Sequence, residues 1–239
     1  MSIRSTTNHF IPFLFLSVGV YLSAMPLASA QNSLIDRMQK AKNSIVTIEA
    51  QKMDSDKTLT SNKMTMLERS GAGVIIHPTG YIVTNTHTIL NAQFIFVTLH
   101  DGTRLSASIA SIAPDSDFTI LKISPPSALQ ALPWADSQTA HLDDEVISIG
   151  NSTLWKETIS GGRINSIGHP QSGKSQTVEL LGMDLNLDHG DSGGPILDHN
   201  GSFLGIVVAK NTHMDRTSYA IPSNKIREHF LNHIKENDR

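Results

Sequence analysis

Residues 71–87 read GAGVIIHPTGYIVTNTH, a stretch that displays the pattern found along most of the chain. Two runs rich in Ile and Val, Gly73–His77 and Tyr81–Asn85, are separated by a Pro-Thr-Gly turn. Short β-branched runs bounded by Gly, Pro and Asn are typical of strands. The stretch therefore predicts two strands, the second of which leads the chain to His87.

The same pattern recurs on both sides of this stretch. Further strands are expected at Ser44–Ala50, Phe94–Leu99, Arg104–Ile112, Phe118–Ile123, Glu145–Ile149, Thr158–Ile167, Gln176–Leu181, Pro195–Leu197 and Ser202–Val208. Many short strands joined by turns such as Asp101-Gly102 and Asn200-Gly201 favour an all-β protein built as sandwiches or barrels.

Helices are expected only at the two ends of the β-rich region. One is predicted at Leu34–Lys42, and another after Ser223, which can cap a helix whose apolar stripe is Ile226, Phe230 and Ile234. The polar stretch Gln51–Ser70 is interpreted as a long mobile loop, and Pro125-Pro126 as a linker between two barrels.

Composition describes an ordinary globular chain and excludes some function classes. Of the 239 residues, 39% are hydrophobic and 17% charged, and the net charge is −3 with no basic stripe, so nucleic acid is not expected as a partner. There is no cysteine, so the fold must rest on its core without disulfides.

The first thirty residues have the pattern of a signal peptide. Arg4 precedes an apolar stretch from Phe10 to Met25, and Ala28-Ser29-Ala30 fits a signal-peptidase site. Cleavage after Ala30 predicts an exported protein, periplasmic or secreted, with a mature chain 31–239. An uncleaved anchor helix is the alternative.

The sequence Gly190-Asp191-Ser192-Gly193-Gly194-Pro195 contains the strongest chemical signal. A serine hydroxyl is a weak nucleophile, so acyl transfer requires a base to activate it and donors to stabilise the oxyanion. Glycines allow backbone N–H groups to converge on one point. Ser192 is therefore the candidate nucleophile, and the amides of Gly190 and Ser192 are the candidate oxyanion hole.

Two further residues complete a candidate catalytic set. His87 is one of 11 histidines but lies at the end of a predicted strand, where its ring can reach a cleft and exchange a proton. Asp117 directly abuts an apolar strand, where a carboxylate needs a partner such as an imidazole N–H; Asp115 is its rival. The order His, Asp, Ser is that of the chymotrypsin group.

These motifs resemble the protease domain of the HtrA/Deg family of trypsin-like serine proteases over roughly residues 34–234. The similar segments are Ser70–Ile76, Gly80–His87, Asp117–Ile123, Ile149–Asn151, Gly190–Pro195 and Tyr219–Ser223. The resemblance implies a chymotrypsin-like double β-barrel, with barrels at about 31–124 and 125–222 and a C-terminal helix at 223–235. It also implies a serine endopeptidase without metal or organic cofactor.

The resemblance further implies how a substrate is held. A primary specificity pocket would be walled by Leu187, Val208, Ala209, Lys210, Thr217, Ser218 and Tyr219. With Leu187 at its base, this pocket would favour small or medium aliphatic side chains before the scissile bond. The backbone of Val208–Lys210 would pair with an extended segment, so unfolded or misfolded polypeptides are the expected substrates.

The chain also departs from the family pattern. Asp191 stands where family members usually have asparagine, and residues 151–154 replace the usual Asn-Pro-Phe-Gly turn. No PDZ domain is expected, and the absence of aromatic residues from 31–42 gives trimer formation little support.

Alternatives from other classes remain open. One is a binding or chaperone-like protein that retains the protease fold with little turnover, and another is a glutamyl endopeptidase. His229 and His233 share one face of the last helix, but Phe230 occupies the place of the glutamate of a zinc peptidase. A solvated helix face is expected there instead of a metal site.

Overall fold

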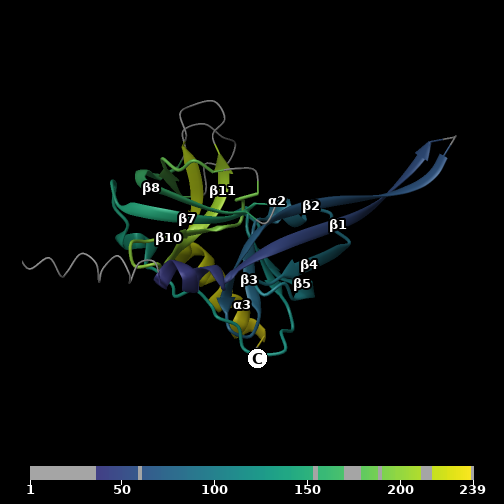
Figure 1. The fold of residues 1–239 in the computed structure, drawn as a ribbon, viewed down its shortest axis with the longest axis horizontal. Coiled ribbons are helices and arrows are strands. Elements are labelled where there is room, and N and C mark those ends of the chain that lie inside the picture. The colour runs from purple at the N-terminus through teal and green to yellow at the C-terminus, as the bar shows by residue number, and fades with distance from the viewer. Residues whose placement is uncertain are drawn as a thin grey trace, which may run out of the picture.

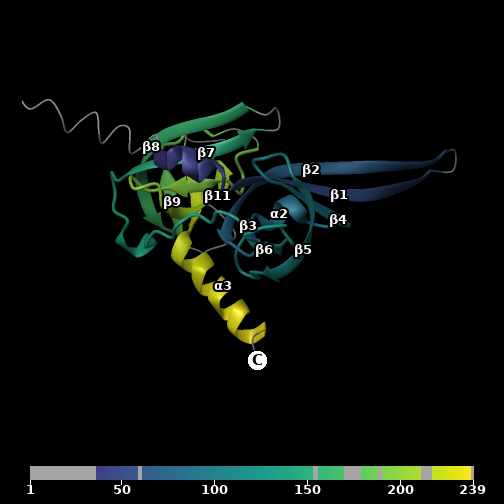
Figure 2. The same ribbon diagram turned by 60° about the horizontal axis from the view of Figure 1, so that its bottom comes forward.

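The computed structural model describes residues 36–58, 61–152, 156–169, 179–187, 190–210 and 217–237, and within them the chain forms two closed β-barrels. The first contains β1 (Ile45–Thr58), β2 (Ser61–His77), β3 (Tyr81–Thr84), β4 (Phe94–Thr98), β5 (Arg104–Ile112) and β6 (Thr119–Lys122), in the order β1-β2-β3-β6-β5-β4. The second contains β7 (Glu145–Ser152), β8 (Lys156–Gly168), β9 (Leu180–Met183), β10 (Pro195–Leu197), β11 (Phe203–Lys210) and β12 (Ser218–Pro222), in the order β10-β11-β12-β9-β8-β7. The two barrels lie side by side (Figures 1 and 2), and the predicted all-β, chymotrypsin-like double barrel is confirmed.

Short helical segments complete the described fold. Residues 36–42 are helical, and they lie within the helix predicted at Leu34–Lys42. The others are α2 (Thr86–Ile89), a 3₁₀ turn (Ser137–Thr139) and α3 (Ser223–Asn237). None of the described helices is long and apolar enough to cross a membrane, and the predicted signal peptide 1–30 lies outside the described residues.

The two strands that lead to His87 bury both of their faces. Ile75 and Ile82 point into the core of the first barrel, whereas Val74 and Val83 belong to a cluster that joins the two barrels. Successive side chains of a strand point to opposite faces, so a strand between two cores must be apolar on both. This explains why these runs show continuous apolar residues instead of alternation.

One expectation about the first barrel is wrong. Gln51–Ser70 is not a loop: its described residues continue β1 and β2 as an antiparallel ribbon, paired from Gln51↔Glu68 to Thr58↔Ser61. Figure 1 shows this ribbon as an arm extending away from the barrels. A ladder of backbone hydrogen bonds needs no apolar side chains, so the polar composition of the segment did not reveal it.

Two features of the second barrel also differ from expectation. β12 (Ser218–Pro222) was not predicted as a strand, because a single short run ending in Pro222 carries little strand signal. β9 covers Leu180–Met183, so the segment predicted at Gln176–Leu181 overlaps it only at its end, and 176–178 lie outside the described residues.

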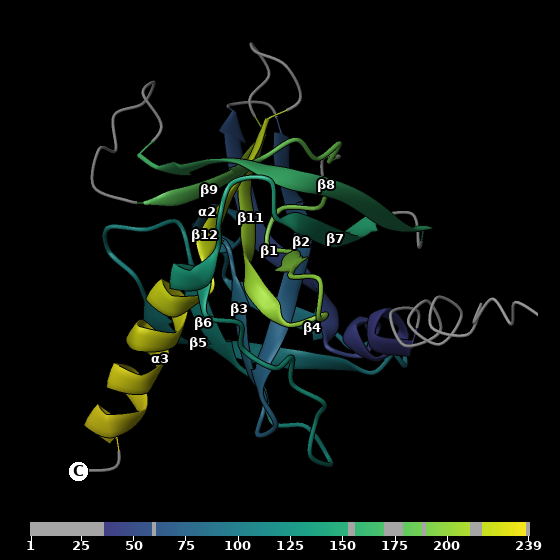
Figure 3. The ribbon, with the colours of Figure 1, turned by 90° about the vertical axis from the view of Figure 1, so that its left-hand side faces the viewer.

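Helix α3 packs across the junction of the barrels. Ile226 and Phe230 are buried in the cluster that joins them, and Figure 3, seen from the side of the second barrel, shows α3 leaving the end of β12. The predicted cap differs in detail: the Ser223 hydroxyl donates to the carbonyl of Ala135 (2.9 Å), whereas the Ser137 hydroxyl accepts from the first-turn N–H of Asn224 (3.1 Å).

Candidate active site

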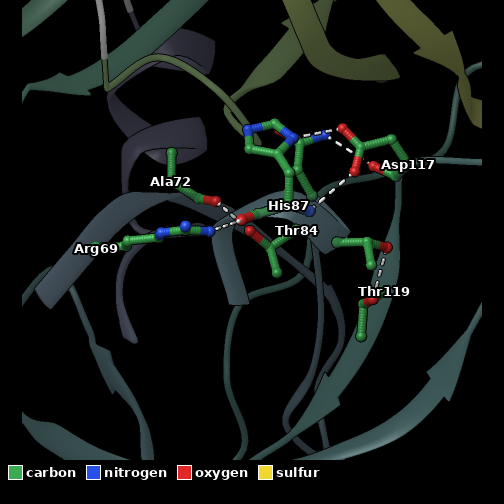
Figure 4. Close-up of polar contacts among 8 residues, drawn as sticks. Arg69, Ala72, Thr84, His87, Asp117 and Thr119 are labelled. Carbon is green, nitrogen blue, oxygen red and sulfur yellow. Dashed lines mark hydrogen bonds and ion pairs between the residues drawn. The ribbon is translucent and has the colours of Figure 1, made fainter. Parts of the chain in front are cut away.

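His87 sits in α2, the single helical turn that follows β3. It was expected at the end of the strand, and the strand does end at Thr84, three residues before it. The turn is held in place from below: the buried hydroxyl of Thr84 donates to the carbonyl of Ala72 (2.7 Å), and the Asn85 amide donates to the carbonyl of Asp117 (3.0 Å). These bonds tie β2, the end of β3 and the segment before β6 together next to the histidine, and Figure 4 shows the bond between Thr84 and Ala72.

Asp117 contacts His87 with both of its carboxylate oxygens. Oδ1 accepts from the backbone N–H of His87 (2.9 Å), and Oδ2 lies 2.5 Å from Nδ1 of the ring. A carboxylate at Nδ1 requires a proton on that nitrogen, which leaves Nε2 with a free lone pair. The side chains are 48% and 33% exposed, respectively, so the ring is open to solvent and to a reactant.

Asp115, the rival carboxylate, is exposed and makes no hydrogen bond to His87 in the structure as described. The carboxylate that contacts this histidine is therefore Asp117, the residue preferred from the sequence, and its catalytic role stays a prediction.

The loop that carries Ser192 comes from the second barrel and docks on the first. The carbonyl of Ser192 accepts from the N–H of Ala72 on β2 (2.9 Å). A side chain at Gly71 would lie 2.9 Å from the side chain of Thr88 and 3.3 Å from the same carbonyl. Because Thr88 follows His87 directly, this contact places the backbone of Ser192 in the neighbourhood of the histidine.

Gly193 is required for this docking. Its φ is +82°, and a Cβ there would lie 2.2 Å from the carbonyl oxygen of Ala72. No side chain fits at that separation, and the left-handed conformation itself favours glycine. The glycine that follows the candidate nucleophile therefore lets the two barrels approach closely at this point.

Two backbone amides of this loop donate hydrogen bonds within the fold. The N–H of Gly193 donates to Val207 (2.9 Å) and that of Gly194 to Asp191 (2.8 Å), so these two amides are engaged within the fold. Gly190 has a φ of +129°, a backbone conformation that needs glycine. The assignment of the oxyanion hole to Gly190 and Ser192 stays a prediction. Asp191 is buried, with 2% of its surface exposed.

The expected specificity residues gather around β11 and β12. Leu187 is 2% exposed in the core of the second barrel, and the buried hydroxyl of Ser218 donates to the carbonyl of Leu185 (3.0 Å). β11 pairs with β12 through Ala209↔Tyr219 and Lys210↔Ser218, and a register shift occurs at Val208. Thr217 lies directly before β12. The role of this group in substrate binding stays a prediction.

Two residues have contacts near the site that the sequence did not predict. The Arg69 guanidinium, through Nη1, donates to the carbonyl of His87 (3.1 Å), as Figure 4 shows. Arg69 lies opposite Ala50 in the ribbon. Because the polar sequence of this segment predicts a loop, the sequence did not indicate which residues Arg69 would contact.

The other is His229 of α3. Its Nε2 lies 2.7 Å from the hydroxyl of Ser111. Its ring packs edge-to-face against the ring of Phe118, with the centroids 5.3 Å apart, and Phe118 directly follows Asp117 in the chain. The predicted solvated face is therefore wrong for His229, which is partly buried. Burial and the neighbouring His233 lower its pKa, and Glu236 opposes that shift. Within the described residues, no three His, Asp or Glu side chains lie close enough together to hold a metal ion.

Comparisons with known proteins agree with this geometry. The family model described as "Trypsin-like peptidase domain" matches residues 71–206. The magnetosome formation protease MamE of Paramagnetospirillum magneticum is 34% identical over 180 residues, which are 70% of this chain and 24% of MamE. The periplasmic serine endoprotease DegP of Escherichia coli strain K12 is 32% identical over 161 residues, 66% of this chain and 34% of DegP.

Solved structures are similar over most of the chain. The HtrA-type protease AlgW with a decapeptide superposes with a TM-score of 0.74 at 25% identity, covering 84% of this chain and 67% of that one. The same protease with a tripeptide gives a TM-score of 0.74 at 25% identity, with 85% of this chain and 64% of that one covered. The chain thus spans a quarter to a third of the length of the curated relatives named above.

Proposed function

The chain belongs to the trypsin-like peptidase domain family and has HtrA and DegP homologues, and from this premise we propose that it is a serine endopeptidase. The observation that carries the proposal is the pairing of His87 with both oxygens of Asp117, at 2.9 and 2.5 Å, beside the docked loop of Ser192. A scaffold without turnover has no physical need for this pairing of a histidine with a carboxylate beside the loop of a serine.

The proposed mechanism assigns one role to each group. Nε2 of His87 takes the proton of Ser192 as the hydroxyl attacks the peptide carbonyl, and the amides of Gly190 and Ser192 stabilise the tetrahedral oxyanion. His87 then protonates the leaving amine, and water repeats the cycle on the acyl-enzyme. Asp117 keeps the proton on Nδ1 and stabilises the imidazolium that forms twice in each turnover.

The proposed substrates are unfolded or misfolded polypeptides. An extended segment would pair with the backbone of Val208–Lys210, and its residue before the scissile bond would lie against Leu187 and Thr217–Tyr219. An apolar pocket discriminates weakly between apolar groups, so cleavage after Val, Ala, Ile and Thr is expected.

The cellular setting is proposed from the N-terminal pattern and from relatives. A signal peptide ending near Ala30 and the periplasmic location of the DegP relative favour an exported, periplasmic protein that takes part in protein quality control. Homotrimer formation is the assembly proposed from the family resemblance, and sedimentation of the purified chain 31–239 tests it.

Ser192→Ala tests the proposed function directly. We expect the variant to lose cleavage of casein and labelling by a fluorophosphonate probe, while its unfolding transition stays that of the wild type, since only one oxygen atom is removed. Ser106→Ala, which changes an exposed serine on β5, is the matched control and should keep both signals. Casein cleavage that persists in Ser192→Ala would contradict the proposal.

Probe labelling, an aggregation assay and a peptide library separate two alternatives. A chaperone-like protein with little turnover would suppress aggregation of an unfolded protein but leave the probe unattached in the wild type. A glutamyl endopeptidase would cleave a peptide library after glutamate instead of after aliphatic residues.

A further inference from the structure

A cationic pocket adjoins His87 on the side of the first barrel. Ala50, Lys52, Leu67 and Arg69 of the β1–β2 ribbon line it on one side, and residues 90–92 after α2 line it on the other, around a volume of about 90 Å³. Lys52 and Arg69 are its charged residues, and no acidic residue is among those that line it.

The strand register explains why this face is positive. Ala50 pairs with Arg69 and Lys52 with Leu67, so these four side chains share one face of the ribbon. The intervening pair, Gln51 and Glu68, points to the opposite face, where Gln51 donates to the Glu68 carboxylate (2.7 Å). The acidic residue nearest in sequence is therefore turned away from the pocket.

Arg69 connects the pocket to the reaction centre. It is exposed, and its Nη1 donates to the carbonyl of His87 (3.1 Å; Figure 4). A guanidinium has five N–H donors in a planar fork, so this single bond leaves donors with which to meet an anion. Leu67 and Leu90, 49% and 55% exposed, supply apolar walls beside the charges.

The position of the pocket relative to β11 determines which part of a substrate it meets. The proposed function places the segment before the scissile bond on β11 of the second barrel. In Figures 1 and 2, β11 and the β1–β2 ribbon lie on opposite sides of α2, which carries His87. An extended chain advances about 3.3 Å per residue, so the first few residues after the scissile bond run towards the ribbon.

We propose that this cationic pocket selects an aspartate or glutamate of the substrate within the first three residues after the scissile bond. This inference rests on the proposed function and adds a charge preference on the leaving-group side. Exposed ion pairs are weak, so each cation should raise the specificity by no more than about five-fold, and salt should screen the effect.

Matched peptides test the proposal. Peptides that differ only by Glu or Gln at each of the first three leaving-group positions are compared by kcat/KM at low and at high salt. The wild type should favour Glu by about three- to ten-fold at one of these positions in low salt, and the preference should disappear near 1 M salt. Arg69→Gln should reduce the Glu/Gln ratio.

Charge reversal gives the sharper readout. Lys52→Glu, which leaves the bond between Arg69 and His87 in place, should lower the Glu/Gln ratio and raise cleavage of a Lys peptide at the same position. Arg104→Gln removes a cation that pairs with Glu49 outside the pocket and is the matched control; its ratio should stay that of the wild type.

The outcomes distinguish the two proposals. Equal cleavage of the Glu and Gln peptides, or a Glu preference that survives both pocket variants, overturns this inference alone. Cleavage of neither peptide overturns the proposed function and this inference with it.

Discussion

Replacing Asp117 with asparagine tests how the carboxylate controls the proton on His87. In the wild type, Oδ1 accepts from the backbone N–H of His87 and Oδ2 faces Nδ1. An amide of the same shape offers one accepting oxygen and one donating NH₂ group. If the amide oxygen keeps the backbone N–H, the NH₂ group faces Nδ1, and the ring proton must move to Nε2. That nitrogen then has no lone pair with which to accept the Ser192 proton.

The expected loss is much larger for activity than for stability. In Ser-His-Asp enzymes this substitution lowers kcat by about 10⁴-fold, which corresponds to roughly 5 kcal/mol of transition-state stabilisation. The amide keeps the size of the side chain and the bond to the backbone N–H, and its NH₂ group donates to Nδ1 in place of the bond that Nδ1 donated. The free energy of unfolding should therefore fall by only about 1 kcal/mol.

The assay compares kcat/KM for an aliphatic peptide near pH 7.5 with the urea unfolding curve of each variant. Asp115→Asn is the control, because that carboxylate is exposed and lies two residues away in the same chain segment. It should retain activity within about two-fold of the wild type. An Asp117→Asn variant within ten-fold of the wild type, or an Asp115→Asn variant as inactive as Asp117→Asn, would refute the assignment.

Two further predictions concern the docked loop and the last helix. Gly193→Ala adds a Cβ 2.2 Å from the carbonyl oxygen of Ala72, at a residue whose φ is +82°. We expect this variant to lose probe labelling and at least about 2 kcal/mol of stability, measured by urea unfolding. A stable and fully labelled variant would show that the docking is not needed. The folded state lowers the pKa of His229, mainly by burial and then through His233, so its contribution to stability is complete above the usual value of 6.5 and is lost as the pH falls below it. His229→Gln should therefore weaken the dependence of the unfolding midpoint on pH between about 7.5 and 5.5, and an unchanged dependence would contradict the role of this histidine.

The inner part of β2 and the whole of β3 were predictable because two cores demand apolar residues on both of their faces. Arg104–Ile112 and Pro195–Leu197 match β5 and β10 at both ends, and other predicted strands overlap observed ones. The arm formed by the outer parts of β1 and β2 was missed, since its backbone ladder imposes no pattern on its side chains. Arg69 was missed for the same reason, because a residue in a supposed loop has no assigned face or neighbour.

The candidate triad shows the same division between local pattern and spatial arrangement. Its residue types, their order along the chain and the glycines around Ser192 are local features, because nucleophile chemistry and tight turns depend on neighbours in sequence. Asp117 was preferred over Asp115 because it directly abuts an apolar strand, which is also a local feature. The two contacts of Asp117 with His87 agree with that choice.

The amino-acid sequence by itself determined that the chain would be rich in short strands, and it supplied a serine, a histidine and a carboxylate as candidates for acyl transfer. Only the tertiary structure decided that the loop of Ser192 rests on Ala72 beside Thr88, that His229 packs next to Phe118, and that Arg69 reaches the carbonyl of His87. The reason is physical: side-chain periodicity sets which face of a strand is buried, whereas contacts between residues far apart in sequence depend on how each barrel closes and how the two barrels pack.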